Sequence, residues 1–194
     1  MKIFVVVDMQ NDFINGSLGT AEAQAIVPKV AQLIKDKADP NTIILFTQDT
    51  HKSDYLKTLE GKNLPVEHCL YMTNGWLINK DVCAAYEEVK DKYFQWAGTL
   101  NPDNPGNQLI WKPSFGSIDL QNYLYEIDDD VEKIEEITFC GLCTGICVLS
   151  NAILAKATLP EVPVKVVKDC CACVSPESHE TALNAMALCQ IEIV

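Results

Sequence analysis

The sequence predicts an α/β protein in which helices cover both faces of a mostly parallel sheet. Short apolar runs rich in β-forming residues alternate with stretches of helical periodicity, which is typical of repeated strand–helix–strand units. The 194 residues contain no linker, repeat or low-complexity tract. We therefore expect one domain that spans residues 1–194.

The expected elements follow the apolar runs in chain order. The strands are Ile3–Asp8, Thr42–Gln48, Gln108–Lys112, Glu136–Cys140 and Val164–Lys168, with Gln190–Val194 as a candidate edge strand. Helical periodicity fits Ala21–Lys37, Asp81–Lys90, Ile146–Ala157 and Pro176–Leu188. The first of these helices places apolar residues on one face and is followed by Pro40; that face comprises Ile26, Val30, Leu33 and Ile34.

Three polar stretches between these elements are expected to be irregular. Thr50–Asn79 is too long for an ordinary connection, and loops of that length are usually functional or tied down. Gly98–Asn107 contains Pro102, Pro105 and Gly106 and is expected to be a surface loop. The acidic run Asp128–Asp130 is expected to be a solvated loop before a strand.

The composition excludes several classes of function. The net charge is −12 and Lys and Arg do not cluster, which argues against binding to nucleic acid or to anionic membranes. No apolar stretch approaches the ~18 residues of a membrane span. The chain begins with a short strand that reaches Asp8 too soon to be a secretory signal. The nine cysteines are odd in number and several lie in apolar runs, so we expect a reduced, cytoplasmic protein.

Cys147 lies where a nucleophile would be expected. The strand that ends near Cys140 breaks at Gly141, and an apolar helical run begins at Ile146. A thiol in the first turn of that helix meets unpaired N–H groups and the positive helix end, which favour a thiolate. It also lies past the carboxyl end of a strand, where ligands bind in open α/β sheets.

Two further strands end in charged residues at the same edge of the sheet. Asp8 ends the first strand, where partial desolvation raises the pKa of a carboxylate toward a value useful for a base. Lys112 ends the third strand. Each residue alone is unremarkable, but with Cys147 they form a credible nucleophile, base and cation.

The loop after the second strand contains a candidate metal site. Asp49 and His51 are followed by Glu60 and His68, which together would suit Zn, Fe or Mn. Spacing alone is weak evidence, although two of the three histidines in the chain fall in this loop. The third, His179, is expected at the surface or as a helix cap.

The remaining cysteines and three aromatic residues have ordinary explanations as well as functional ones. Cys170, Cys171 and Cys173 could be redox-active or bind a metal, but small buried thiols are the favoured interpretation. Phe13, Trp96 and Phe115 flank the candidate site in sequence. As core residues they need no further account, whereas as pocket walls they would suit a flat heteroaromatic ring.

The chain resembles the isochorismatase-like cysteine hydrolases, and among them the nicotinamidases. The resemblance rests on three segments, each on its expected element: Asp8-x-Gln10-Asn11-Asp12-Phe13, Trp111-Lys112-Pro113-Ser114-Phe115 and Gly141-Leu142-Cys143-Thr144-Gly145-Ile146-Cys147-Val148. It implies a doubly wound, three-layer αβα fold with six strands. Relatives often carry Asp where this chain has Gly145 and His where it has Tyr55.

The resemblance also implies how the site would work. It assigns Asp8, Lys112 and Cys147 to a catalytic triad. It places a cis peptide bond before the nucleophile, here at Leu142–Cys143, and an oxyanion hole formed by the N–H groups of Cys143 and Cys147. In its glutamate-containing version, the metal ligands correspond to Asp49, His51, Glu60 and His68, and the ion orients the substrate ring.

We therefore expect a cytoplasmic, cysteine-dependent amidohydrolase that converts nicotinamide to nicotinate and ammonia with a divalent metal, zinc by preference. One alternative is a metal-free relative that acts on another small amide or carbamoyl compound. A second is a catalytically silent interaction module, and a third is a redox sensor that uses the Cys170–Cys173 turn. We expect a small-molecule amide as substrate and a homo-oligomer, with no nucleic acid or membrane as partner.

Overall fold

The computed structural model describes residues 1–94 and 108–194, with the side chains of 130 and 131 left aside. Its centre is a parallel six-stranded sheet in the order β3-β2-β1-β4-β5-β6. The strands are β1 (Lys2–Val7), β2 (Thr42–Asp49), β3 (Leu109–Lys112), β4 (Glu136–Leu142), β5 (Val164–Ala172) and β6 (Glu192–Ile193). The prediction of a doubly wound parallel α/β sheet is confirmed.

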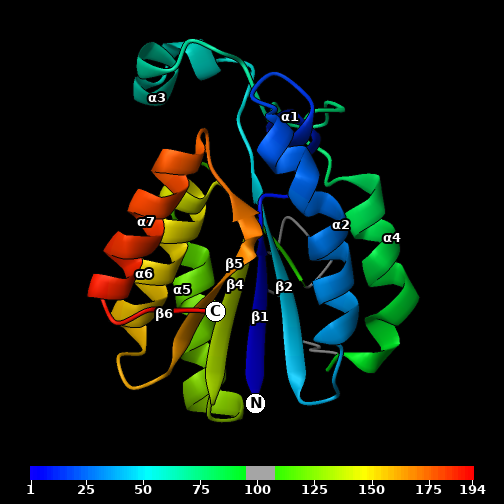
Figure 1. Ribbon diagram of the computed structural model, residues 1–194, viewed down its shortest axis with the longest axis vertical. Helices are drawn as coiled ribbons and strands as arrows, with labels where there is room; N and C mark the ends of the chain where they lie inside the picture. Colours follow the sequence, from blue (N-terminus) through cyan, green and yellow to red (C-terminus); the bar gives the residue numbers. More distant parts are fainter. Residues whose placement is uncertain (95–107) are drawn as a thin grey trace.

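Helices cover both faces of this sheet. The longer ones are α2 (Ala21–Asp36), α4 (Lys80–Val89), α5 (Ile118–Glu126), α6 (Leu149–Thr158) and α7 (Pro176–Leu188). Figure 1 shows α2 and α4 on one side of the sheet and α5, α6 and α7 on the other. Among the described residues, no helix has both the length and the apolar character needed to cross a bilayer.

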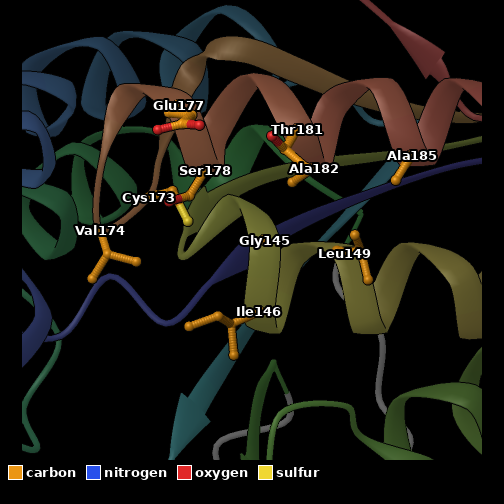
Figure 2. Close-up of a pocket in the computed structure, with 10 residues that line it drawn as sticks. All are labelled: Gly145, Ile146, Leu149, Cys173, Val174, Glu177, Ser178, Thr181, Ala182 and Ala185. Carbon is orange, nitrogen blue, oxygen red and sulfur yellow. The ribbon is translucent and has the colours of Figure 1, made fainter.

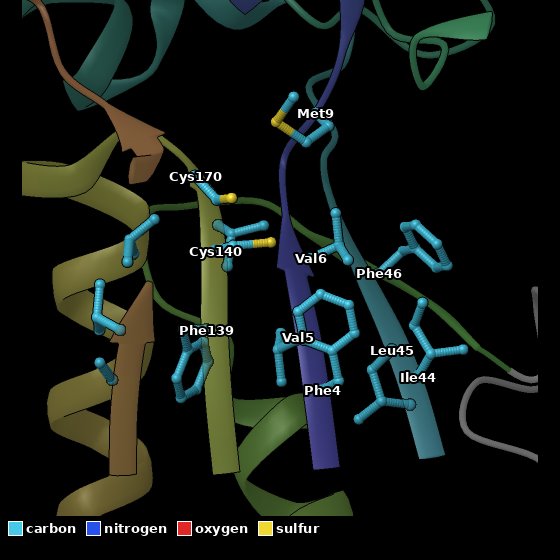
Figure 3. Packing of buried hydrophobic residues seen from close by; sticks show 14 of the residues in the cluster. Phe4, Val5, Val6, Met9, Ile44, Leu45, Phe46, Phe139, Cys140 and Cys170 are labelled. Carbon is cyan, nitrogen blue, oxygen red and sulfur yellow. The ribbon is translucent and has the colours of Figure 1, made fainter. Parts of the chain in front are cut away.

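The central strands are apolar because both of their faces are covered. In β1 every residue after Lys2 is buried, and all eight residues of β2 are buried. Figure 3 shows Phe4, Val5 and Val6 packed beside Ile44, Leu45 and Phe46 of β2 and Phe139 of β4. Because each such side chain contributes about 1.5–3 kcal/mol when fully buried, these strands form the stable centre that carries the polar residues at their ends.

Short helices interrupt the long polar loop between β2 and α4. The expected irregular segment Thr50–Asn79 contains η1 (Tyr55–Lys57) and α3 (Leu59–Asn63), and α1 (Asn11–Ile14) follows β1. In Figure 1, α1 and α3 both lie beyond the carboxyl ends of the strands. The loop therefore lies over the edge of the sheet where the site residues were expected.

The structure differs from the sequence prediction at three places. Helix α5 was not predicted, although Ser117 caps it and its buried apolar residues, Leu120, Tyr123 and Leu124, follow helical spacing. The acidic run is not a loop but part of a helical turn, η3 (Ile127–Val131). Cys170 and Cys171 do not follow β5 but belong to it. The predicted loop Gly98–Asn107 lies outside the described residues.

Candidate active site and metal centre

The chain adds β2 and β3 on one side of β1 and then β4, β5 and β6 on its other side, so the order of strands reverses between β1 and β4. The candidate nucleophile lies at this switch point. Val7 of β1 pairs with Gly141 of β4, so Asp8 and the segment after β4 leave the sheet side by side. On the other side of β1, Asp49 pairs with Lys112 at the carboxyl ends of β2 and β3. This switch point is where open α/β sheets bind their ligands.

Gly141 allows β1 and β4 to approach closely at this point. It has a φ of +115°, which a residue with a side chain rarely adopts, and an added Cβ would lie 2.1 Å from the carbonyl oxygen of Val7. The Leu142–Cys143 peptide that follows is cis, as the family resemblance implied. The N–H of Cys143 donates to no described residue, so it is free to contact a ligand.

Cys147 lies in a π-helical turn, η4 (Thr144–Val148), that leads into α6. Figure 2 shows this turn beneath α7, where Gly145, Cys173, Ser178 and Ala182 are among the residues that line a hollow of about 490 Å³. A Cβ on Gly145 would meet the Ala182 Cβ and the Cys173 sulfur at 3.3 Å, so a side chain there would crowd α7.

Lys112 contacts the other two predicted catalytic residues, Asp8 and Cys147. Its Nζ lies 2.7 Å from Asp8 Oδ2 and 3.4 Å from Cys147 Sγ. It also donates to the carbonyl of Ser114 at 2.9 Å and lies 3.5 Å from Asp49 Oδ1. All of these side chains are buried, so the ammonium is the cation that neutralises this edge of the sheet.

Asp8 has contacts suited to a base. It is fully buried, its Oδ1 accepts a hydrogen bond from Thr47 at 2.7 Å, and its Oδ2 lies 2.7 Å from the Lys112 Nζ that also contacts Cys147 Sγ. Its backbone φ of 45° is in the left-handed region, which is uncommon outside glycine but more accessible to Asp. Burial raises the pKa of Asp8 above its usual value, although the charge of Lys112 opposes that shift.

Burial and neighbouring charges shift the pKa values of both Cys147 and Lys112. Burial raises the pKa of the Cys147 thiol well above its usual value, and Lys112 offsets only part of this effect. Burial alone would lower the pKa of Lys112, but Asp8, Cys147 and Asp49 raise it well above the ordinary value. Burial thus opposes the thiolate that the helix end favours, so a base beside the thiol is required for attack.

The four predicted metal ligands converge beside this triad. One ligand atom from each of Asp49, His51, Glu60 and His68 lies within 4.8 Å of the others. Nε2 of His51 is 3.0 Å from Asp49 Oδ2 and Nε2 of His68 is 3.5 Å from the same oxygen. His51 Nε2 is nevertheless buried without a hydrogen bond of normal geometry among the described residues.

This donor set fits a divalent metal. Two imidazoles and two carboxylates form an N/O site suited to Zn, Fe or Mn. His68 Nδ1 lies 2.8 Å from the Val66 carbonyl, which can only accept, so Nδ1 carries the proton and Nε2 is left to bind an ion. Burial alone would raise the pKa of Asp49, but the charge of Lys112 lowers it below the usual value and keeps this ligand ionised.

Residues that the sequence reasoning did not assign hold the metal ligands in place. The carboxamide of Gln10 accepts from the Asp49 N–H at 2.7 Å and donates to the Asp49 carbonyl at 2.8 Å. The ring of the fully buried Tyr55 packs against His51 and His68, with centroid distances of 4.6 and 4.9 Å. The periodicity of the sequence does not predict these supporting roles, because each depends on contacts that form only in the folded protein.

A cavity of about 210 Å³ connects the metal ligands to the nucleophile. Its lining includes Asp49, Glu60 and His68 from the metal ligands together with Cys143 and Cys147. Phe13 and Phe115 also line it, and their role as walls of a substrate pocket stays a prediction. Trp96 lies outside the described residues. Leu64 and Ile146 complete an apolar wall that sequence reasoning did not assign.

The other cysteines and His179 have structural positions. All nine cysteines are free, and Cys170, Cys171 and Cys173 are buried, which agrees with their interpretation as packed thiols. His179 is half-buried and its Nδ1 is 2.8 Å from the hydroxyl of Thr144, so it supports the nucleophile turn instead of lying free at the surface.

The doubly wound sheet and the polar cluster at its carboxyl edge define an α/β protein with a candidate enzyme site at the topological switch point. Comparison with known proteins identifies the family. The family model described as Isochorismatase domain matches residues 2–194, so the chain belongs to the isochorismatase family. No curated protein matches the sequence significantly.

Solved structures of pyrazinamidases and nicotinamidases have the same fold. The pyrazinamidase/nicotinamidase from Streptococcus mutans UA159 is 25% identical, with 100% of both chains covered and a TM-score of 0.79. The pyrazinamidase of Pyrococcus horikoshii, solved with zinc, is 24% identical over 100% of this chain and 98% of that one, with a TM-score of 0.73. An L. infantum protein in complex with nicotinate is 17% identical, with 100% and 92% covered and a TM-score of 0.73.

Proposed function

We propose that the chain is a nicotinamidase, which hydrolyses nicotinamide to nicotinate and ammonia through a thioester on Cys147. The observation that carries the proposal is the shared cavity, because its walls bring Cys147 together with Asp49, Glu60 and His68. Its volume of about 210 Å³ suits a substrate no larger than a single substituted ring. The pyrazinamidase/nicotinamidase fold of the neighbouring structures supports the same substrate class.

The first half of the reaction forms the thioester. Asp8, which contacts the same Lys112 Nζ as Cys147, takes the proton from the thiol, and the sulfur attacks the amide carbon. The N–H groups of Cys143 and Cys147 donate to the oxyanion that develops, a contribution of roughly 2.7–4 kcal/mol per donor. The protonated Asp8 then gives its proton to the departing nitrogen, and ammonia leaves.

The second half releases the acid. Asp8, again a carboxylate, takes a proton from a water molecule that attacks the thioester carbon, and the sulfur of Cys147 leaves and recovers the proton. Lys112 remains protonated throughout because Asp8, Cys147 and Asp49 surround it. Its charge favours the ionised form of whichever partner holds the negative charge.

Asp49, His51, Glu60 and His68 would hold a divalent ion, for which we propose zinc. When bound, such an ion would supply a Lewis acid for the ring nitrogen of the substrate. Phe13, whose ring is 5.5 Å from that of His68, would contact the face of the substrate beside the metal ligands.

The proposal is tested by measuring ammonia and nicotinate released from nicotinamide. We expect release by the wild-type protein and none by Cys147→Ala. Equal release by both proteins, or none by the wild type, would overturn the enzyme assignment. The second part of the test measures the metal content of protein purified without chelator. Full amidase activity in metal-free protein would instead favour a metal-independent hydrolase of another small amide or carbamoyl compound.

A further inference from the structure

The side chain of Asn151 bridges the two segments that carry Cys147 and follow Lys112. Asn151 lies in the first turn of α6 and is fully buried. Its Nδ2 donates to the carbonyl of Cys147 at 2.8 Å and to the carbonyl of Phe115 at 3.2 Å. Its Oδ1 accepts from the N–H of Ser117 at 2.9 Å.

All three of these partners are backbone groups, so the contacts fix the course of the chain. One partner belongs to the nucleophile itself. The other two belong to the segment from Pro113 to Ser117, which connects β3 to α5. The same segment accepts the hydrogen bond from Lys112 Nζ through the carbonyl of Ser114. A single buried carboxamide thus joins the turn that carries the sulfur to the segment that receives the ammonium.

We propose that Asn151 is a positioning residue that keeps Cys147 Sγ within reach of Lys112 Nζ and aimed into the cavity. The Lys112 side chain crosses from β3 to the sulfur at 3.4 Å, and no other described side chain bonds to both the Cys147 carbonyl and the 113–117 segment. Hydrolysis depends on this placement, because misplacing a reacting group by about 1 Å can cost about 100-fold in rate. The kinetic consequence rests on the proposed function, whereas the structural consequence does not.

The matched control is Gln121, a second buried carboxamide that bonds to the same segment. Its Nε2 donates to the carbonyl of Ser117 at 3.2 Å and its Oε1 accepts from Thr158 at 3.3 Å. Gln121 contacts neither Cys147 nor Phe115 through a described hydrogen bond. Gln121→Leu therefore removes a comparable set of buried hydrogen bonds without breaking the bridge to the nucleophile.

The experiment compares Asn151→Leu, Asn151→Thr and Gln121→Leu. Both Asn151 variants break the bridge, and Thr retains a hydroxyl that can bond to the carbonyl four residues earlier, so it is the variant that folds if Leu does not. In the Asn151 variants we expect kcat for nicotinamide to fall about 10- to 100-fold while KM changes much less. In Gln121→Leu we expect both constants to stay close to wild type.

Crystal structures of the wild type and the variants decide the inference independently of the substrate. We expect the Nζ–Sγ distance to exceed the wild-type value in the Asn151 variant and to be unchanged in Gln121→Leu. An unchanged distance in a folded Asn151 variant overturns the proposal, as does an equal lengthening in the Gln121 control. If the wild type does not hydrolyse nicotinamide, the proposed function fails, but these distances still test the role of Asn151.

Discussion

The Nζ of Lys112 lies 2.7 Å from Oδ2 of Asp8, and both side chains are completely buried. Asp49 Oδ1 is 3.5 Å from the same nitrogen, so one cation serves two buried carboxylates. Since an unpaired charge in the protein interior is costly, this arrangement links the stability of the fold to the chemistry of the site.

The first prediction concerns the loss of this cation. Lys112→Met keeps much of the side-chain volume but leaves the carboxylate of Asp8 without its partner, which we expect to cost about 3–5 kcal/mol of unfolding free energy. Removing the charge of the partner as well, in Lys112→Met with Asp8→Asn, should recover part of that loss. Both values follow from urea unfolding curves.

Lys35 provides the control for this prediction. Its Nζ is 2.6 Å from Glu88 Oε2, but the two side chains are 35% and 63% exposed. Lys35→Met should therefore cost only about 0–1 kcal/mol. Equal losses for the buried and the exposed lysine would show that burial does not govern the interaction.

The second prediction is the acid limb of the pH–rate profile. Asp8 accepts the thiol proton only as a carboxylate, and its pKa is raised above the ordinary value of 3.8. As the pH falls through this raised pKa, the base becomes protonated and kcat/KM should decline, at a pH clearly above 3.8. Initial rates of ammonia release in a constant-ionic-strength buffer series test this, and a midpoint at or below the ordinary value would contradict it.

Much of the site could be predicted because parallel strands end at one edge of a sheet. Asp8 directly follows β1, Lys112 ends β3 and Cys147 follows β4, so their convergence depended only on recognising the strands and their common direction. Helix α5 could also have been found, since its capping serine and apolar spacing are present in the sequence.

The remaining features depend on distances that sequence spacing does not encode. Gln10 and Asp49 are 39 residues apart, yet their hydrogen bonds exist only because β1 and β2 are neighbours in register. Asn151 likewise meets Ser117 through the packing of α6 beside the start of α5. The depth of burial of Cys147 was likewise not predictable, because its position in a turn indicates a helix end but not how far the thiol is buried.

The third prediction is that Gln10 tunes metal binding. Its carboxamide brackets the backbone of Asp49 on both sides and also donates to the Trp76 carbonyl at 2.9 Å. Gln10→Leu should weaken the affinity for Zn²⁺ by about 10- to 100-fold, as expected when an outer-shell partner is lost. Competition with a chromophoric chelator at fixed pH measures the change.

Gln48 is the matched control for the metal experiment. It is equally buried and donates to the same Trp76 carbonyl at 2.7 Å, but its side chain makes no described hydrogen bond to a metal ligand. Gln48→Leu should destabilise the fold while leaving zinc affinity close to wild type. A parallel loss of affinity in both variants would assign the effect of Gln10 to general destabilisation.

The fourth prediction concerns how the metal-binding loop is attached to the rest of the protein. Oδ2 of Asp12 accepts from the N–H of Cys69 at 2.7 Å, directly after the ligand His68. Gly75 lies so close to this carboxylate that an added Cβ would be 2.0 Å from the same oxygen. Gly75→Ala should therefore displace Asp12 and leave the buried Cys69 N–H unpaired, at a cost of about 1–3 kcal/mol together with weaker zinc binding.

A glycine that meets only a flexible side chain separates this effect from crowding in general. A Cβ at Gly116 would lie 2.7 Å from the Leu154 Cδ1, and that methyl group can move aside, so Gly116→Ala should be nearly neutral in thermal melting. If Gly75→Ala also melts and binds zinc like the wild type, then the Asp12 carboxylate does not hold the loop. If it loses stability and keeps its zinc affinity, the attachment supports the fold but not the geometry of His68.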